Sequence, residues 1–132
     1  MTFVLSIAAL TVAISTLTRP APRPTYTTAE KSAAQERLCA QYKLASKAAH
    51  IETALDGDIA LARISMINGA LILESAAAEP ALATDFRDAA RALADAYQTM
   101  AATGSLGDNE KYKATVDATN AKVGAMNDLC GD

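Results

Sequence analysis

DGDIALARISMINGALILESAAAEP, residues 56–80, is the stretch that decides the fold class. It opens with the turn signal DGD and closes at Pro80, which cannot continue a helix. The body of the segment carries only two charged residues, Arg63 and Glu74. A helix is therefore predicted over residues 59–78, and it is apolar most of the way round rather than along a single stripe.

A helix of this kind is either central in its bundle or covered by another molecule. A fully central helix is difficult to arrange in so small a domain. We therefore expect this helix to serve self-association or the docking of a protein partner, with simple burial as the alternative. The candidate interaction surface consists of Ile59, Ile64, Met66, Ile67, Leu71 and Leu73.

The preceding helix has a clear start signal. Thr27 and Glu30 fit a capping box, and Asp58 is placed to cap the helix that follows. The apolar residues between these caps recur with the spacing of a helix. The predicted core stripe of this first helix is Leu38, Tyr42, Ala45 and Ala49, widened by Leu44, Ile51 and Leu55, where the helix is expected to end.

Two further helices are predicted downstream. The third is expected to open at Pro80 and to end near residue 102, and Asp108 is expected to cap the fourth. Short connections between four helices predict an all-α, up-down antiparallel bundle. A kink at Asn68 and Gly69 would leave a three-helix arrangement as the alternative.

The predicted core is thin and calls for a covalent link. Alanine supplies 31 of the 132 residues, and alanine favours helices but buries little area. Cys39 lies near the start of the first helix and Cys130 ends the fourth, so an up-down bundle can bring both to the same end. We predict a disulfide between them, with two free buried thiols as the alternative.

The domain carries no chemical signature. Residues 27–132 hold 10 Lys and Arg against 15 Asp and Glu, a composition that excludes the basic footprint of nucleic-acid binding and disfavours anionic lipid. His50 is the only histidine, and it lies about 16 Å along the helix from Cys39, which excludes a shared metal site within that helix. No catalytic residue, metal site or cofactor is predicted, and no enzymatic activity is expected.

The N-terminal residues are of a different character. Residues 1–18 are uncharged and apolar, which predicts a transmembrane anchor or a signal segment, and residues 19–26 form a proline-rich spacer. Arg19 and Arg23 follow the apolar run, where the positive-inside rule favours the cytoplasm, whereas paired cysteines favour the outside. A longer natural N-terminus with basic residues would reconcile the two signals. We expect a bundle outside the cytoplasm, held at the cell membrane, with secretion as the alternative.

The order of these segments is familiar. RPAPRPTYT, TTAEKSAAQERLCAQYKLASKAA, FRDAARALADAYQTMAA and the closing AMNDLCGD together resemble small alanine-rich, membrane-anchored or exported proteins of mycobacteria and related actinobacteria. The resemblance implies a location in the cell envelope and supports the two-cysteine arrangement. It implies no activity and no functional residues.

These observations lead to two expected functions. The first is a membrane-tethered accessory or protein-interaction module of the cell envelope, which docks through the second helix and has no catalytic activity. The alternative is a secreted helical protein that binds a lipid or another apolar ligand between its alanine-lined helices.

Overall fold

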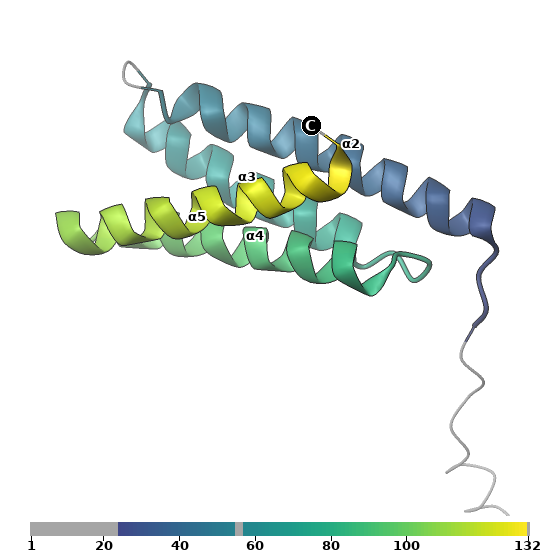
Figure 1. Ribbon diagram of the computed structural model, residues 1–132. Coiled ribbons are helices and arrows are strands. Elements are labelled where there is room, and N and C mark those ends of the chain that lie inside the picture. The colour runs from purple at the N-terminus through teal and green to yellow at the C-terminus, as the bar shows by residue number, and fades with distance from the viewer. Residues whose placement is uncertain (1–23, 55–56, 132) are drawn as a thin grey trace, which may run out of the picture.

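The computed structural model describes residues 24–54 and 57–131. These ranges are helical and contain no strand, which confirms the predicted all-α fold with four helices. The second helix runs without a break through Asn68 and Gly69, so the three-helix alternative is wrong. The helices are α2 (Thr28–Glu52), α3 (Ile59–Ala77), α4 (Thr84–Thr103) and α5 (Asn109–Cys130) (Figure 1). The predicted anchor or signal segment at 1–18 and most of the spacer at 19–26 lie outside the described residues.

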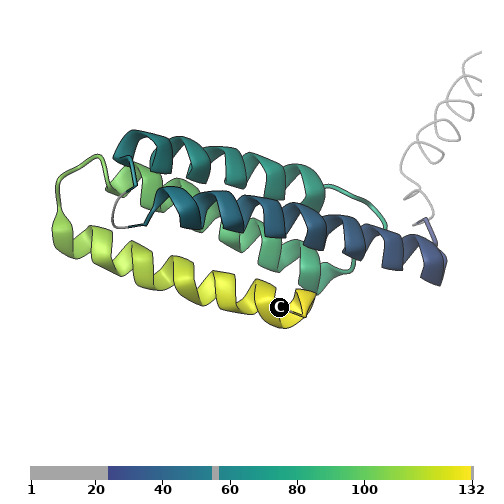
Figure 2. The same ribbon diagram turned by 90° about the horizontal axis from the view of Figure 1, so that it is seen from above.

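The helices form the predicted up-down bundle. Successive helices run antiparallel, so that α3 packs between α2 and α4, and α5 packs against α4 (Figures 1 and 2). The C-terminal end of α5 returns beside α2, while the first turns of α2 project beyond the end of the bundle (Figure 1). The bundle thus has three closely packed helix pairs, a thinner seam between α2 and α5, and an equally thin contact between α2 and α4.

The predicted N-terminal caps are confirmed. The Glu30 amide donates to the Thr27 hydroxyl at 3.2 Å, and the Thr27 amide donates to the Glu30 carboxylate at 2.7 Å, completing the capping box. The Asp58 carboxylate accepts from the amides of Ala60 and Leu61, and the Asp108 carboxylate accepts from the next helix in the same way. These side chains satisfy amides that the first turn of a helix leaves unpaired.

Two helix boundaries differ from the prediction. The first helix ends at Glu52 rather than at 55, because the Thr53 hydroxyl and amide both donate to the Ala49 carbonyl and close the last turn. The third helix begins at Thr84 rather than at Pro80. A turn separates α3 from α4, and two of its residues, Ala81 and Leu82, are buried against the core.

Arg87 holds this turn in place. Its guanidinium donates to the carbonyls of Ala77 at 3.2 Å, Glu79 at 3.1 Å and Leu82 at 2.9 Å. The end of α3 otherwise leaves carbonyl groups without partners inside the helix. One side chain of α4 therefore fixes both the end of α3 and the path into α4.

Substitution of Arg87 tests this role. Arg87→Ala is expected to lower the free energy of unfolding by about 1–3 kcal/mol, because several charge-assisted hydrogen bonds are lost and part-buried carbonyls remain unpaired. Denaturant unfolding followed by circular dichroism measures the change. Arg91→Ala, at a half-exposed arginine 4.0 Å from Glu74, is the matched control and is expected to change stability by less than about 0.5 kcal/mol. Equal losses in the two variants would contradict the role of Arg87.

The core combines many alanines with a few large side chains. The largest fully buried side chains are those of Tyr42, Leu38, Leu73, Leu93 and Met126. Alanine and glycine elsewhere in the core let the helices approach closely. A Cβ atom added at Gly69 would lie 3.2 Å from the Tyr97 ring and 3.4 Å from the Ala45 Cβ. At Gly69, α3 therefore passes close to α4 on one side and to α2 on the other.

The buried Tyr97 links stability to high pH. Burial raises the pKa of its hydroxyl to about 12, more than a hydrogen bond with the Ser46 side chain lowers it. Because the unfolded chain releases this proton near pH 10, the stability from Tyr97 is complete below pH 10 and is lost as pH rises to 12. Tyr97→Phe is expected to remove roughly 2–3 kcal/mol of this decline. Denaturant unfolding between pH 9 and pH 12 measures it, and an identical decline in both proteins would contradict the assignment.

Candidate interaction surface

The structure divides the six residues of the predicted surface on α3 into three groups. Ile64, Ile67 and Leu71 lie on the outward face, with 54%, 42% and 60% of their surface exposed. Ile59 is also exposed, but at the first turn of α3, at the end of the bundle. Met66 and Leu73 are buried in the core, so their assignment to the surface is wrong.

The reason for this division lies in the inward face of α3. Besides Met66 and Leu73, this face carries only small residues, because the helix runs close to α2 and α4. The small inward residues are Ala62, Gly69, Ala70 and Ala77. Large side chains that do not fit between the neighbouring helices are therefore left on the outward side.

The neighbouring helix α2 extends this surface. Leu44 and Ile51 were expected to widen the α2 core stripe, but they are 57% and 56% exposed. Leu44 follows Arg37 and Gln41 at helical spacing, and those two residues line a shallow groove between α2 and α3 together with Leu71. We define the α2–α3 apolar face as Leu44, Ile51, Leu61, Ile64, Ile67 and Leu71.

The charged residues of α3 leave this face clear. Arg63 reaches to α4, where its guanidinium donates to the Gly104 carbonyl at 2.7 Å. Glu74 also faces α4, with its carboxylate 4.0 Å from the Arg91 guanidinium. Both charges therefore lie along the border with α4. In the centre of α3, the exposed side chains of the face are interrupted only by the uncharged Asn68.

The groove beside the apolar face has a polar end. The Arg37 guanidinium and the Glu79 carboxylate form an ion pair of 3.1 Å across it, between α2 and the turn after α3. The arginine is 62% exposed, so this pair contributes little stability. It marks the point at which the apolar face gives way to charged surface.

The composition of α3 is also that of a membrane span. Among the described residues, it is the single helix long and apolar enough to cross a membrane, and 28% of its most apolar stretch is buried inside the bundle. The core helix of a soluble protein passes the same test, so the composition alone does not place α3 in a membrane. The most apolar helix of the described chain thus has eight exposed residues among its 19.

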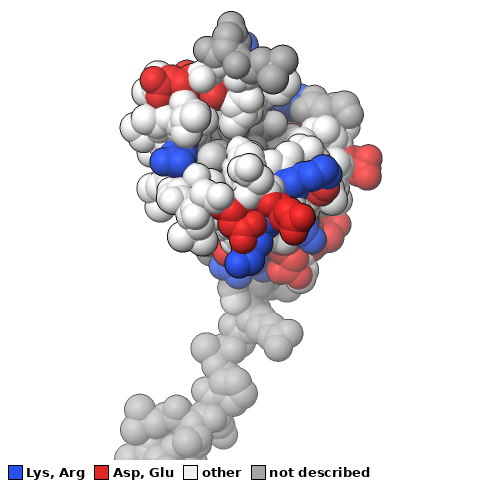
Figure 3. All heavy atoms as spheres, turned by 90° about the vertical axis from the view of Figure 1, so that its left-hand side faces the viewer, with Lys and Arg blue, Asp and Glu red and all other residues white. Residues whose placement is uncertain are grey.

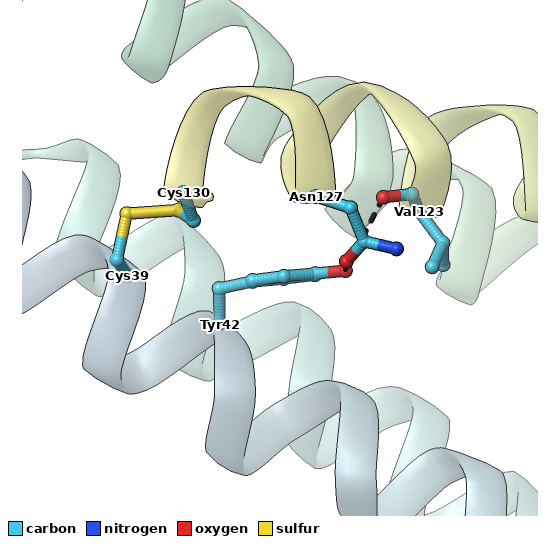
Figure 4. The surroundings of a disulfide bond; sticks show 5 residues. All are labelled: Cys39, Tyr42, Val123, Asn127 and Cys130. Carbon is cyan, nitrogen blue, oxygen red and sulfur yellow. Dashed lines mark hydrogen bonds between the residues drawn. A yellow bond between two sulfur atoms is a disulfide. The ribbon is translucent and has the colours of Figure 1, made fainter. Parts of the chain in front are cut away.

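The predicted disulfide is confirmed at the seam between α2 and α5. Cys39 and Cys130 are joined with their Cα atoms 5.5 Å apart, and next to them the Tyr42 ring lies between the two helices (Figure 4). The Tyr42 hydroxyl donates to the Asn127 side-chain oxygen and lies 3.2 Å from the Val123 carbonyl. Disulfides of this kind are typical of oxidising compartments.

A pocket of about 280 Å³ lies at the end of the bundle where the α2–α3 and α4–α5 connections meet. Met66, Met100 and Tyr112 line it, and polar groups of Glu52 and Asp108 also border it. Figure 3 looks onto this end, where uncharged side chains fill the middle and charged side chains of both signs surround them. Within the described residues, no group of three His, Cys, Asp or Glu side chains is placed to hold a metal ion.

Neither Leu44 and Ile51 nor the pocket was predicted as a site. The sequence did carry a signal for Leu44 and Ile51, because their angular offset from the buried stripe of α2 favours exposure to solvent over burial in the core. The signal for the pocket was the pair of turn clusters, DGD and TGSLGDN, which an up-down topology brings together at one end of the bundle. Comparison of the chain with family models, with curated proteins and with solved structures returned no match.

Proposed function

We propose that this protein is an interaction module of the cell envelope that docks a protein through the α2–α3 apolar face. The observation that carries the proposal is the exposure of Ile64, Ile67 and Leu71 on the most apolar helix, beside an exposed Leu44 on α2. Contiguous exposed apolar side chains on two adjacent helices mark sites of association. The resemblance of the sequence to exported alanine-rich proteins agrees with this role.

The proposed location is the outer side of the cell membrane, with residues 1–18 as the tether. The Cys39–Cys130 disulfide supports a compartment that maintains disulfides. Two measurements test the location: fractionation with an alkaline carbonate wash, and labelling of free thiols in intact cells before and after reduction. Recovery in the washed membrane pellet, with thiols labelled only after reduction, is the expected result. A reduced protein in the soluble cytoplasmic fraction would contradict it.

The docking role is tested by charge substitution on the face. Ile64→Lys is expected to lower the recovery of cross-linked protein partners at least tenfold, because a charge then has to be desolvated at the contact. Leu106→Lys is the matched control, since Leu106 is 73% exposed in the connection between α4 and α5, outside the face. Quantitative mass spectrometry after cross-linking the full chain in its native cells measures recovery. Unchanged recovery with Ile64→Lys would contradict docking through this face.

The binding of an apolar ligand is the weaker candidate. The pocket at the end of the bundle, about 280 Å³, is slightly smaller than the roughly 300–1,000 Å³ of most ligand pockets. It is also bordered by carboxylates, which do not suit a lipid chain. Three large apolar side chains of α3, those of Ile64, Ile67 and Leu71, lie on its outward face rather than in the pocket, which favours a protein contact.

A further inference from the structure

We propose that the partner of the apolar face is a second copy of this chain, bound by antiparallel packing of the two α3 helices. The proposal rests on the proposed docking role of the face and names its occupant. The two copies would be related by a two-fold axis that crosses the outward face of α3 between Ile67 and Leu71, at the level of the inward-facing Gly69. Three observations carry the proposal: the spacing of the outward residues, the placement of the two charges of α3, and the extent of the face.

The outward residues of α3 have the spacing of a coiled-coil seam. Ala60, Ile64, Ile67, Leu71, Glu74 and Ala78 follow one another at alternating intervals of four and three residues, with Ala78 as the C-cap of the helix and Glu74 as the one charged member. This is the a and d pattern of a heptad repeat, which helices use to pack along a shared seam. Within the monomer, α3 packs on α2 and α4 through other residues, so this seam remains on the outside.

The seam is complementary to itself when its direction is reversed. Reversal about Gly69 places Ile67 of one copy against Leu71 of the other and brings the two small ends, Ala60 and Ala78, together. The large residues Ile67 and Leu71 then meet at the centre, Ile64 of each copy lies opposite Glu74 of the other, and the alanines meet at the two ends. An isologous contact requires this match of one patch with its own reversed copy.

The charges of α3 match under the same operation. Along α3, Arg63 and Glu74 lie at nearly the same distance from the axis, to within one residue, on opposite sides of it. Both lie along the α4 border of the seam. Reversal therefore places Arg63 of each copy beside Glu74 of the other, which pairs opposite charges and favours the antiparallel orientation. Asn68 lies beside the axis, where the two side-chain amides can hydrogen bond to each other.

The extent of the face suits a weak contact between two copies. A helix of the length of α3 spans about 28 Å, and two adjacent helices present a width of roughly 20 Å. The α2 residues of the face, Leu44 and Ile51, lie on that added width. The resulting footprint of roughly 560 Å² is smaller than the roughly 800 Å² that each partner contributes to a standard protein interface, which is the size class of a readily dissociating dimer.

Disulfide cross-linking at the axis tests the proposal. Asn68→Cys in the full chain is expected to give, after mild oxidation of a detergent-free lysate, at least tenfold more covalent dimer than Leu106→Cys. Leu106 is 73% exposed and lies far from the axis along the chain. Peptide mapping verifies that Cys39 and Cys130 remain paired. Equal yields from the two variants, or no dimer from Asn68→Cys, would overturn the proposal.

A charge exchange tests the orientation. Arg63→Glu and Glu74→Arg are each expected to weaken the Asn68→Cys dimer several-fold, and the two together are expected to restore it. Thermal melting of each variant shows whether the bundle itself remains folded. Loss of the dimer in the double variant at unchanged melting temperature would overturn the antiparallel register.

The same set of variants separates this inference from the proposed function. Ile67→Glu is expected to abolish the dimer, whereas Leu106→Glu leaves it intact. If the chain is monomeric yet cross-links another protein through the face, the second copy is wrong and the docking role stands. If the monomer instead binds phosphatidylglycerol vesicles through Ile67, both are wrong.

Discussion

The double substitution Cys39→Ala and Cys130→Ala is expected to lower the free energy of unfolding by about 4–5 kcal/mol in the chain-entropy model. The disulfide joins residues 91 positions apart, so it constrains most of the described chain in the unfolded state. Domains of this size are stable by only about 5–15 kcal/mol in total. Removal of this one bond is therefore expected to bring the bundle close to its folding threshold.

The structure indicates which helix is destabilised first when the disulfide is removed. Helix α5 contributes only Thr119 and Met126 to the buried residues, and its contact with α2 is thin outside the disulfide and the Tyr42 hydrogen bonds. Hydrogen exchange in the disulfide-free protein is expected to accelerate in α5 before α3 and α4. Uniform acceleration in all described helices would contradict this order.

The loss of stability itself is measured by urea unfolding of the oxidised protein and the double variant, followed by circular dichroism. The unsubstituted protein in excess phosphine reductant is the control, and it is expected to lose the same amount. If the variant is already unfolded in buffer, both proteins are titrated in a stabilising osmolyte and compared there. A difference below about 1 kcal/mol would show that α5 is held by other contacts.

The features that the sequence predicted correctly are local or topological. Thr27, Asp58 and Asp108 act as caps through atoms within three residues of themselves, so a short motif is sufficient to find them. The disulfide followed from chain order, because an up-down bundle returns its fourth helix beside its first. Neither prediction required knowledge of how the helices rotate about their axes.

The errors in the predicted surface concern the rotation of α3 about its own axis, that is, which side of the helix faces the core. On a helix that is apolar all round, periodicity does not say which side faces inward, and so Met66 and Leu73 were grouped with Ile64 and Leu71. The structure settles this at Gly69, where the Tyr97 ring leaves room for no large side chain. The position of the small residues, rather than of the large ones, determined the inward face of α3.

The candidate site was accordingly predicted in part. The identity of the helix and three of its outward residues, Ile64, Ile67 and Leu71, were predicted, because no other segment of the domain is as apolar. The share of α2 in the face was missed, because Leu44 and Ile51 were assigned to the core as large apolar side chains although their helical angle places them away from the buried stripe. The role of Arg87 was also missed, because its partners are main-chain carbonyls, which carry no sequence signal.

Tyr42→Ala is expected to lower the free energy of unfolding by about 3–5 kcal/mol, the range for truncation of a large buried aromatic side chain. Tyr42 is 1% exposed and has the largest side chain among the fully buried residues. Its ring lies between α2 and α5 beside the disulfide (Figure 4), and these two helices pack less closely than the successive helices do. Because alanine makes up much of the buried core, few of its side chains are large enough to fill the resulting cavity.

Tyr42→Phe separates the packing of the ring from the hydrogen bonds of the hydroxyl. The ring is kept, but the Asn127 side-chain oxygen and the Val123 carbonyl lose a donor, so a loss of about 1–3 kcal/mol is expected. Asn127→Ala added to Tyr42→Phe is expected to cost less than the sum of the two single losses, because the two groups share one interaction. Urea unfolding of the four oxidised proteins completes the cycle. Additive losses would show that the hydroxyl and Asn127 contribute independently of each other.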